Sequence, residues 1–221
     1  MNSLFDAVVL GLLALLPLIN PPTTVALFLA LSKGLSREEK NKQAFLTAFY
    51  VFIIMTLTYY IGEFVMGVFN ISIPGLRIAG GGILIVIGSR MLFPQPREIS
   101  SSGNGAVERT SFAFIPLAMP STAGPGTIAM IISASATIKN NTVFPPWVLL
   151  TAPPLIFLSV SLILWCCLLA SDLIMKAIGE SGIDAISRLM GFLLVCMGVQ
   201  FAINGSIEII QTIMNNNTKI T

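Results

Sequence analysis

Long apolar stretches separated by short polar segments run along the whole chain. A helix of about 20 apolar residues crosses the roughly 30 Å hydrocarbon core of a bilayer, and each of these stretches is at least that long. The pattern predicts an all-α integral membrane protein with six transmembrane helices. These cover residues 4–32, 43–69, 73–93, 111–138, 145–171 and 183–210.

The first and fourth stretches carry prolines near their middle. Proline removes a backbone donor and clashes with the preceding helical turn. We therefore expect both helices to be broken, at residues 20–22 and at residues 120–126. The two breaks also resemble one another, because residues 16–24 (LPLINPPTT) align with residues 115–123 (IPLAMPSTA).

A second internal similarity points to a duplication. The third and sixth stretches each contain an arginine followed three residues later by a glycine, at Arg77 and Gly80 and at Arg188 and Gly191. We predict two three-helix repeats within one membrane domain. Their boundaries are 1–93 for the first repeat, 94–110 for a polar linker and 111–221 for the second repeat.

Composition agrees with a membrane environment and excludes several classes of function. Hydrophobic residues make up 55% of the 221 positions and charged residues 10%, against roughly 25% charged in soluble domains. The net charge of +2 is small and no basic patch is interleaved with aromatic residues, so nucleic-acid binding is not expected. Histidine is absent and the three cysteines lack metal-ligand spacing. We therefore expect neither an enzyme nor a metal or other cofactor.

Most of the twelve Lys and Arg residues follow the first, third and fifth stretches. Cytoplasmic loops are enriched in these residues, so both termini are predicted on the outer, periplasmic side. Three spans per repeat then place the second repeat upside down relative to the first. Inverted repeats with discontinuous helices are typical of secondary transporters, whose substrate sites lie where the broken helices expose their ends.

The two breaks form the predicted substrate site. A helix that restarts after a break offers free N–H groups and the positive end of its dipole, which suit a carboxylate. Glycines there would let a ligand approach the backbone. The predicted substrate-binding residues are Asn20, Pro21, Thr23, Thr24, Arg77, Pro120, Ser121, Thr122, Gly124, Gly126, Thr127 and Arg188.

Simpler interpretations stay open for parts of this set. The prolines could merely kink two helices while Asn20 bonds to a neighbouring span. Arg77 and Arg188 lie near helix starts, where they could extend to lipid headgroups instead of binding a solute. Glu63, in the outer part of the second span, could pair with Arg77.

Four segments, 16–27, 73–81, 116–128 and 186–191, resemble the MarC family of bacterial inner-membrane proteins, and the resemblance covers essentially the whole chain. It implies a six-span plasma-membrane protein. It also implies similarity to the LysE-type exporters and to members regarded as small neutral amino-acid transporters. The family name alludes to multiple antibiotic resistance.

These observations predict a secondary transporter of a small solute, a neutral amino acid or another small carboxylate-bearing molecule, that works by alternating access. A proton or sodium ion could drive it, and seams of small residues could pack helices within one subunit or in a homo-oligomer. Multidrug or antibiotic efflux is the alternative transport function, although the small residues at the second break favour a smaller solute. A non-transporting scaffold or sensor is the remaining alternative, and it predicts a dry, fully packed centre.

Overall fold

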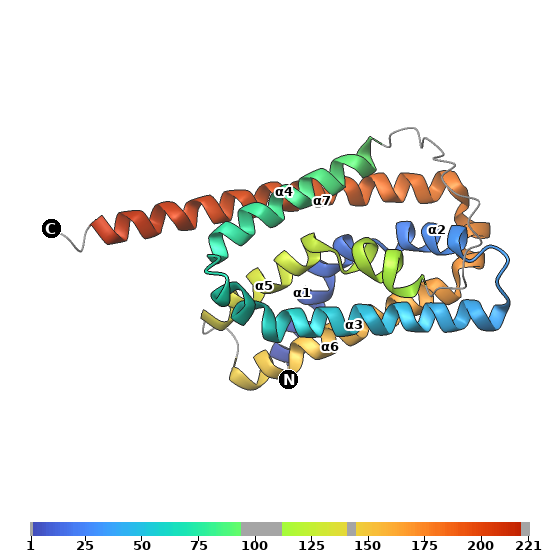
Figure 1. Ribbon diagram of the computed structural model, residues 1–221, viewed down its shortest axis with the longest axis horizontal. Helices are drawn as coiled ribbons and strands as arrows, with labels where there is room; N and C mark the ends of the chain where they lie inside the picture. The colour runs from blue at the N-terminus through green and yellow to red at the C-terminus, as the bar shows by residue number, and fades with distance from the viewer. Residues whose placement is uncertain (1, 94–111, 141–144, 218–221) are drawn as a thin grey trace.

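The computed structural model describes residues 2–93, 112–140 and 145–217, and every regular element in this part of the chain is helical (Figure 1). This confirms the predicted all-α class for these residues, and the predicted linker at 94–110 lies outside them. The elements are α1 (Asn2–Ile19), α2 (Pro21–Leu31), α3 (Arg37–Val68), α4 (Ile73–Leu92), the π-helix η1 (Ala113–Thr122), α5 (Pro125–Asn140), α6 (Pro146–Leu169) and α7 (Ser171–Asn217).

Capping residues fix where α3 and α4 begin. Ser36 accepts a hydrogen bond from the Glu39 N–H, and the Glu39 carboxylate accepts one from the Ser36 N–H, which together form a capping box. At the start of α4 the Ser72 hydroxyl accepts from the Gly75 N–H at 3.2 Å. These caps satisfy N–H groups that have no partner inside the helix.

The described helices include four that are long and apolar enough to cross a membrane, namely α3, α4, α6 and α7. Helices α1 and α2 pass the same test together, as one span bent by 45°. The segment of η1 and α5 does not pass this test. Within it, Pro125–Ile138 forms an apolar helix that is shorter than the test requires. The protein is therefore a multi-pass helical membrane protein with four spans, or five with the bent pair, by these criteria.

The last helix differs from the predicted span at 183–210. It covers residues 171–217 and contains a break at Gly179, where φ is 72° and ψ is 170°. Glycine tolerates this positive φ because it has no Cβ. From residue 180 onward the helix is roughly 55 Å long at 1.5 Å per residue, and its C-terminal part extends past the other helices (Figure 1).

Helices α4 and α7 lie side by side and run in opposite directions (Figure 1). Their backbones touch. A Cβ added at Gly81 would lie 2.5 Å from the Gly198 carbonyl oxygen, and one added at Gly88 would lie 2.5 Å from that of Gly191. Glycine is required at these positions because any side chain would overlap the neighbouring backbone.

Helices α3 and α6 form a second antiparallel pair. The Tyr59 hydroxyl donates to the Leu149 carbonyl at 3.2 Å near one end of the pair. Near the other end Phe45 packs edge-on against Trp165, with 6.1 Å between the ring centroids. The broken helices α1–α2 and η1–α5 lie between this pair and the α4–α7 pair (Figure 1).

The core is formed by buried side chains of the broken helices and of α3 and α6, among them Phe28, Met55, Leu117 and Leu164. Large apolar residues also cover the outside of the bundle, as expected for a surface that faces lipid tails. They include Phe5, Leu13, Phe64, Leu150 and Leu158.

The two ends of the bundle differ in their charged groups. At one, which we term the Lys40 end, α3 and α7 begin and Lys40 Nζ lies 4.0 Å from Asp172 Oδ2. At the other, which we term the Arg77 end, α4 begins and Arg77 pairs with Glu208.

Candidate functional site

The first break consists of one residue, Asn20. It adopts the left-handed conformation (φ 45°, ψ 63°) between α1 and α2, and Pro21 and Pro22 occupy the first two positions of α2. Asparagine is among the few non-glycine residues that visit this region readily. Proline is tolerated in a first helical turn because no intrahelical N–H bond is needed there. The sequence thus places a hinge residue directly before a helix start.

Thr24 satisfies the Ile19 carbonyl, which the first break leaves without a backbone donor. Its side chain is fully buried, and its hydroxyl lies 3.3 Å from the Ile19 carbonyl and 3.2 Å from the Asn20 carbonyl. An unpaired backbone group away from water would cost several kcal/mol. The threonine removes much of that cost.

The second break is wider. Helix η1 carries bonds of π-helical length, from Leu117 N to Phe112 O (3.4 Å) and from Ala123 N to Ala118 O (2.9 Å). A proline removes a donor from the α-helical ladder, and π-type turns are one way in which a helix accommodates such a defect. The chain leaves the helix at Ala123 and restarts at Pro125, inside the predicted window of 120–126.

Threonines serve this break too. The Thr122 hydroxyl donates to the Leu117 carbonyl at 3.0 Å, and the Thr127 hydroxyl donates to the Thr122 carbonyl at 3.1 Å. Both side chains are buried. Each break therefore carries a threonine that bonds back to a carbonyl five residues earlier.

The two breaks meet in the middle of the protein. Thr24 Oγ1 and Thr122 Oγ1 lie 3.3 Å apart, although they are separated by 98 positions in the sequence. Beside them Asn20 Nδ2 donates to Thr23 Oγ1 at 2.8 Å, and Thr23 Oγ1 lies 3.0 Å from Ser187 Oγ of α7. We call these residues and Thr127 the central polar cluster; it consists of Asn20, Thr23, Thr24, Thr122, Thr127 and Ser187.

One strong acceptor in this cluster has no partner among the described residues. Asn20 is 5% exposed, and its Oδ1 is buried without a hydrogen bond. Its Nδ2 faces Thr23 Oγ1 and the Met91 sulfur at 3.4 Å, two atoms that can accept, so Nδ2 is the amide atom that belongs there. An unsatisfied buried acceptor costs about 1–3 kcal/mol. A ligand with an N–H or O–H donor would relieve that cost.

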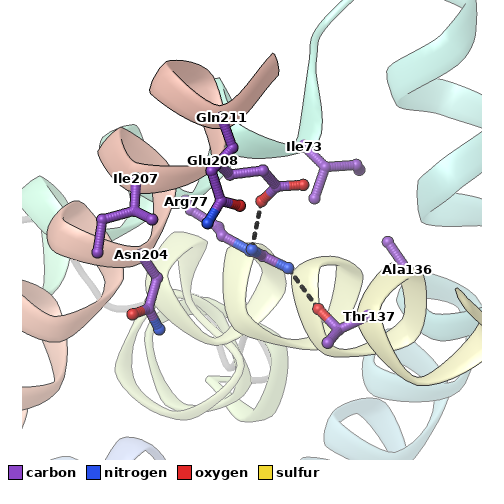
Figure 2. A pocket seen from close by; sticks show the side chains of 8 residues that line it. All are labelled: Ile73, Arg77, Ala136, Thr137, Asn204, Ile207, Glu208 and Gln211. Atoms are coloured by element: carbon purple, nitrogen blue, oxygen red, sulfur yellow. Dashed lines mark hydrogen bonds and ion pairs between the residues drawn. The ribbon is translucent and has the colours of Figure 1, made fainter. Parts of the chain in front are cut away.

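A second polar site lies at the Arg77 end (Figure 2). The Arg77 guanidinium donates through Nε to Ser133 Oγ at 2.6 Å, through Nη1 to Glu208 Oε2 at 2.5 Å, and through Nη2 to Thr137 Oγ1. The carboxylate that pairs with this guanidinium is Glu208 of α7, whereas the sequence had suggested Glu63 as a possible partner. The site borders a cavity of about 510 Å³, lined by Ile73, Arg77, Ala136, Thr137, Asn204, Ile207, Glu208 and Gln211.

Another cavity of about 510 Å³ opens at the Lys40 end. It lies between the end of α2, the start of α3, the end of α6 and the start of α7. Its lining contains three cationic side chains and one carboxylate. The lining residues are Phe28, Arg37, Lys40, Asn41, Leu168, Leu169, Ser171, Asp172, Leu173 and Lys176.

Comparison with known sequences identifies the family of this membrane protein. A family model described as "MarC family integral membrane protein" matches residues 5–210. The chain belongs to the MarC family. The UPF0056 inner membrane protein MarC of Salmonella typhimurium is 58% identical over 219 residues, which cover 96% of this chain and 99% of the relative. Proteins of the same name from Citrobacter koseri and Escherichia coli O1:K1 / APEC have the same identity and coverage. No solved structure matches the chain.

In this MarC-family protein the predicted site residues fall into two groups and an outlier. Asn20, Thr23, Thr24, Thr122 and Thr127 come together in the central polar cluster. Pro21 begins α2 beside them, and Gly124 is buried in the second break. Pro120 and Ser121 lie in η1, and their side chains are outside the described structure. Arg77 belongs to the separate site at its own end of the bundle. Arg188 is exposed, without a hydrogen bond or ion pair to another described residue.

Two details of the predicted site need correction. Helix α2 offers few free donors, because Pro21 and Pro22 have no N–H and Thr24 N already bonds to Asn20 O at 3.2 Å. Gly126 does not face open space, since a Cβ there would lie 2.5 Å from Leu84 Cδ2. This glycine lets α5 approach α4 closely.

Two residues of these sites, Ser187 and Glu208, were not among the predicted site residues. Ser187 joins the central cluster through Thr23, directly before Arg188 in the duplicated motif of the last helix. Glu208 is a lone carboxylate in a strongly apolar segment, and an intramembrane charge is a signal for a cavity or a partner. In the described part of this MarC-family chain, no group of His, Cys, Asp and Glu residues could hold a metal ion.

Proposed function

We propose that this MarC-family protein is a secondary transporter of the bacterial inner membrane that moves a small solute by alternating access around its two breaks. The observation that carries the proposal is the contact between Thr24 and Thr122, with the unpartnered Asn20 Oδ1 beside it. Broken helices that meet at their polar ends form the substrate sites of inverted-repeat transporters. The relatives are named inner membrane proteins.

The proposed topology has six spans in two inverted repeats, 1–93 and 111–221, with η1 and α5 as the fourth span. Three pairings support it. Each element contacts its counterpart in the other half: α3 packs on α6, α4 packs on α7, and the first break touches the second. The paired helices are antiparallel (Figure 1), as an axis lying in the membrane plane requires.

The proposed orientation puts the Lys40 end in the cytoplasm and both termini in the periplasm. Arg37, Lys40 and Lys176 gather at that end around one cavity, and cytoplasmic segments are enriched in such residues. The Arg77 end then faces the periplasm.

Two cavities of similar volume at opposite ends, separated by a closed polar centre, fit an alternating-access protein. On the cytoplasmic side Phe28 lines the cavity and lies one helical turn beyond Thr24 on α2. Phe28 is almost fully buried. Opening towards the cytoplasm would therefore require this side chain to move.

A neutral amino acid or another small carboxylate-bearing molecule is the solute we favour. Asn20 Oδ1 accepts from an ammonium or hydroxyl group, and the first turn of α5 supplies the Gly126 and Thr127 N–H groups, which lie outside the intrahelical ladder and suit a carboxylate. The groups in the cluster are small and neutral. A proton or sodium ion could couple to the movement.

Thermal stability of the purified protein in detergent tests this proposal. Wild type, Thr122→Ala and Thr47→Ala are heated with amino acids, small organic acids and several antibiotics. Thr47 is the matched control, because it is fully buried and its hydroxyl bonds to the Gln43 carbonyl at 2.8 Å, within α3 and not to a residue of either break. A ligand at a hundredfold excess over its Kd stabilises the native state by roughly 2.7 kcal/mol.

We expect a small amino acid to raise the melting temperature of wild type and of Thr47→Ala by more than it raises that of Thr122→Ala. The same solute should then exchange across proteoliposomes that contain wild type. If it stabilises all three proteins equally, the breaks are not the binding site. If no solute shifts melting and none exchanges, the threonines serve only to bond the backbone carbonyls of their own breaks, and the scaffold or sensor alternative is favoured. A shift by antibiotics alone would favour efflux.

A further inference from the structure

The cavity at the Arg77 end contains one partly buried cation and one anion at hydrogen-bonding distance. The Arg77 side chain is 15% exposed and that of Glu208 is 41% exposed, with 2.5 Å between Nη1 and Oε2. Arg77 is held from two further positions on α5, Ser133 and Thr137. The arginine is thus fixed in place, while the carboxylate at the wall of the cavity is the more accessible partner (Figure 2).

The wall formed by α7 is polar in an otherwise apolar segment. Asn204, Ile207, Glu208 and Gln211 are spaced by three and four residues and therefore share one face of the helix, and all four line the cavity. Adjacent positions on the other faces, such as Ile203 and Ile210, are exposed apolar residues. Polar side chains in such a segment usually face a cavity or a partner. One carboxylate and two carboxamides therefore lie on the wall of the cavity that Arg77 also lines.

We propose that this cavity is a binding site for zwitterionic solutes, distinct from the central polar cluster. The solute carboxylate takes the place of Glu208 on the Arg77 guanidinium, and the solute ammonium binds the Glu208 carboxylate that is released. One ion pair is exchanged for two, so no charge is left unpaired. Arginine suits this role because its planar group holds a carboxylate through two N–H donors.

The same geometry disfavours solutes with a single charge. An anion that displaced Glu208 from Arg77 would leave the Glu208 carboxylate without its partner, next to another negative charge. A cation that drew Glu208 away would leave a largely buried guanidinium. Removing one partner of an ion pair leaves an uncompensated charge, at a cost that grows with burial and is therefore larger for Arg77, at 15% exposed, than for Glu208, at 41%. The ion pair therefore selects zwitterions in two ways: it attracts both of their charged groups, and it disfavours solutes that carry only one charge.

A seam between α4 and α5 separates this site from the centre. Beyond Arg77 and Ser133, Gly80 lies against Ala129, and Gly126 then lies against Leu84. The small residues let the two helices close directly on one another. The inference rests on the proposed transport function and adds an outer site on the far side of this seam, where the solute class is selected.

Charge-dependent binding to the full-length protein in nanodiscs tests the inference. The probes are alanine, serine and leucine as zwitterions, propionate as the anion alone and ethylamine as the cation alone. Melting is followed against probe concentration in wild type, Glu208→Gln, Arg77→Gln and Asp184→Asn. Asp184 is the matched control, because it is an exposed carboxylate on the same helix that does not line the cavity.

In wild type and Asp184→Asn we expect a zwitterion to raise the melting temperature while propionate and ethylamine do not. Glu208→Gln frees the guanidinium, so propionate binding should appear and the apparent affinity for the zwitterion should fall at least tenfold. Arg77→Gln frees the carboxylate, so ethylamine binding should appear instead. If either single variant does not fold, Arg77→Glu combined with Glu208→Arg restores the pair and should restore zwitterion binding.

The outcomes separate this inference from the proposed function. If zwitterions bind wild type and Glu208→Gln equally, or if none binds wild type, the inference is overturned. Transport is judged apart from it, by solute exchange in proteoliposomes. Loss of exchange in Thr122→Ala with zwitterion binding retained would support both proposals. Exchange that proceeds without any charge selectivity at this cavity would support transport alone.

Discussion

The two breaks interrupt a membrane helix with different backbone conformations. The first is a single left-handed residue, Asn20, followed at once by a new helix. The second is a ten-residue π-helix, η1, that ends at Thr122 with no left-handed residue, since Ala123 has φ −97°. Both nevertheless carry a threonine hydroxyl bonded to a carbonyl five residues earlier, and these two hydroxyls lie 3.3 Å apart.

The difference shows that aligned prolines need not perform aligned roles. The duplicated motif pairs Pro21 with Pro120, yet Pro21 begins α2 whereas Pro120 lies inside η1 and α5 begins at Pro125. In the first half, one non-helical residue separates α1 from α2. In the second half, the regular α-helical bonding is replaced by π-helical bonding over the whole of η1. What the two halves share is the need to satisfy backbone groups in a medium without water.

The largest effect on stability is expected from Phe28, the side chain through which α2 packs against the residue before η1. Phe28 of α2 packs edge-on against Phe112, the residue before η1, with 6.1 Å between the ring centroids. Phe28→Ala should lower the free energy of unfolding by about 3–5 kcal/mol, the usual cost of removing a buried aromatic ring. Equilibrium unfolding in mixed micelles measures this.

Phe64→Ala is the control for that experiment, because Phe64 is 73% exposed on the outside of the bundle. Its effect should stay within about 0.5 kcal/mol, as for surface positions in general. Equal effects at the two positions would mean that α2 does not pack against the start of η1 as described.

Intermediate effects are expected when the hydroxyls are removed. Thr24→Val and Thr122→Val keep the side-chain shape. The first leaves the buried Ile19 carbonyl unpaired, which should cost about 1–3 kcal/mol, and the second removes the hydroxyl bond to the Leu117 carbonyl, which should cost about 0.5–1.5 kcal/mol. Because the two hydroxyls lie 3.3 Å apart, the double variant should deviate from additivity by about 0.5–1.5 kcal/mol. A double-mutant cycle measures this coupling, and Thr24→Val with Thr47→Val serves as the uncoupled pair. Strict additivity for Thr24 and Thr122 would mean that the breaks do not touch.

Much of the fold follows from local patterns in the sequence. Apolar length located the long helices, proline located both breaks, and the helix class needed no long-range information. The last helix contains the predicted span at 183–210 but extends beyond both of its ends, and the break at Gly179 was not predicted because a positive φ at glycine leaves no trace in hydrophobicity. The length of η1 was also missed, because nothing local distinguishes a π-helix from a simple kink.

The site was predictable as far as it depends on the broken helices themselves. Thr24 and Thr122 could be selected because they adjoin the breaks. Ser187 and Glu208 come from α7, and their positions depend on how closely its glycines let it approach α4. Such side chains are placed by tertiary packing, so an intramembrane carboxylate could be noticed but its partner could not be derived. The partner found for Arg77 is accordingly Glu208, whereas Glu63 was the partner considered from the sequence.

The smallest expected effect discriminates most directly between the two breaks. Asn20→Ala and Asn20→Gly both remove the Asn20 amide, but only alanine must hold a Cβ in the left-handed region, which costs roughly 1–2 kcal/mol. Asn20→Gly should therefore be more stable than Asn20→Ala by about 1 kcal/mol. At the second break the order should reverse, because Ala123 has a negative φ and Ala123→Gly mainly adds backbone freedom to the unfolded chain, at a cost of about 0.5–1 kcal/mol. The free energies of unfolding of these three variants and of wild type, measured under one set of conditions, give the sign of the alanine-to-glycine difference at position 20 and at position 123. Alanine equal to glycine at position 20 would mean that the first break does not depend on a left-handed residue, and the contrast between a point hinge and a distributed one would be lost.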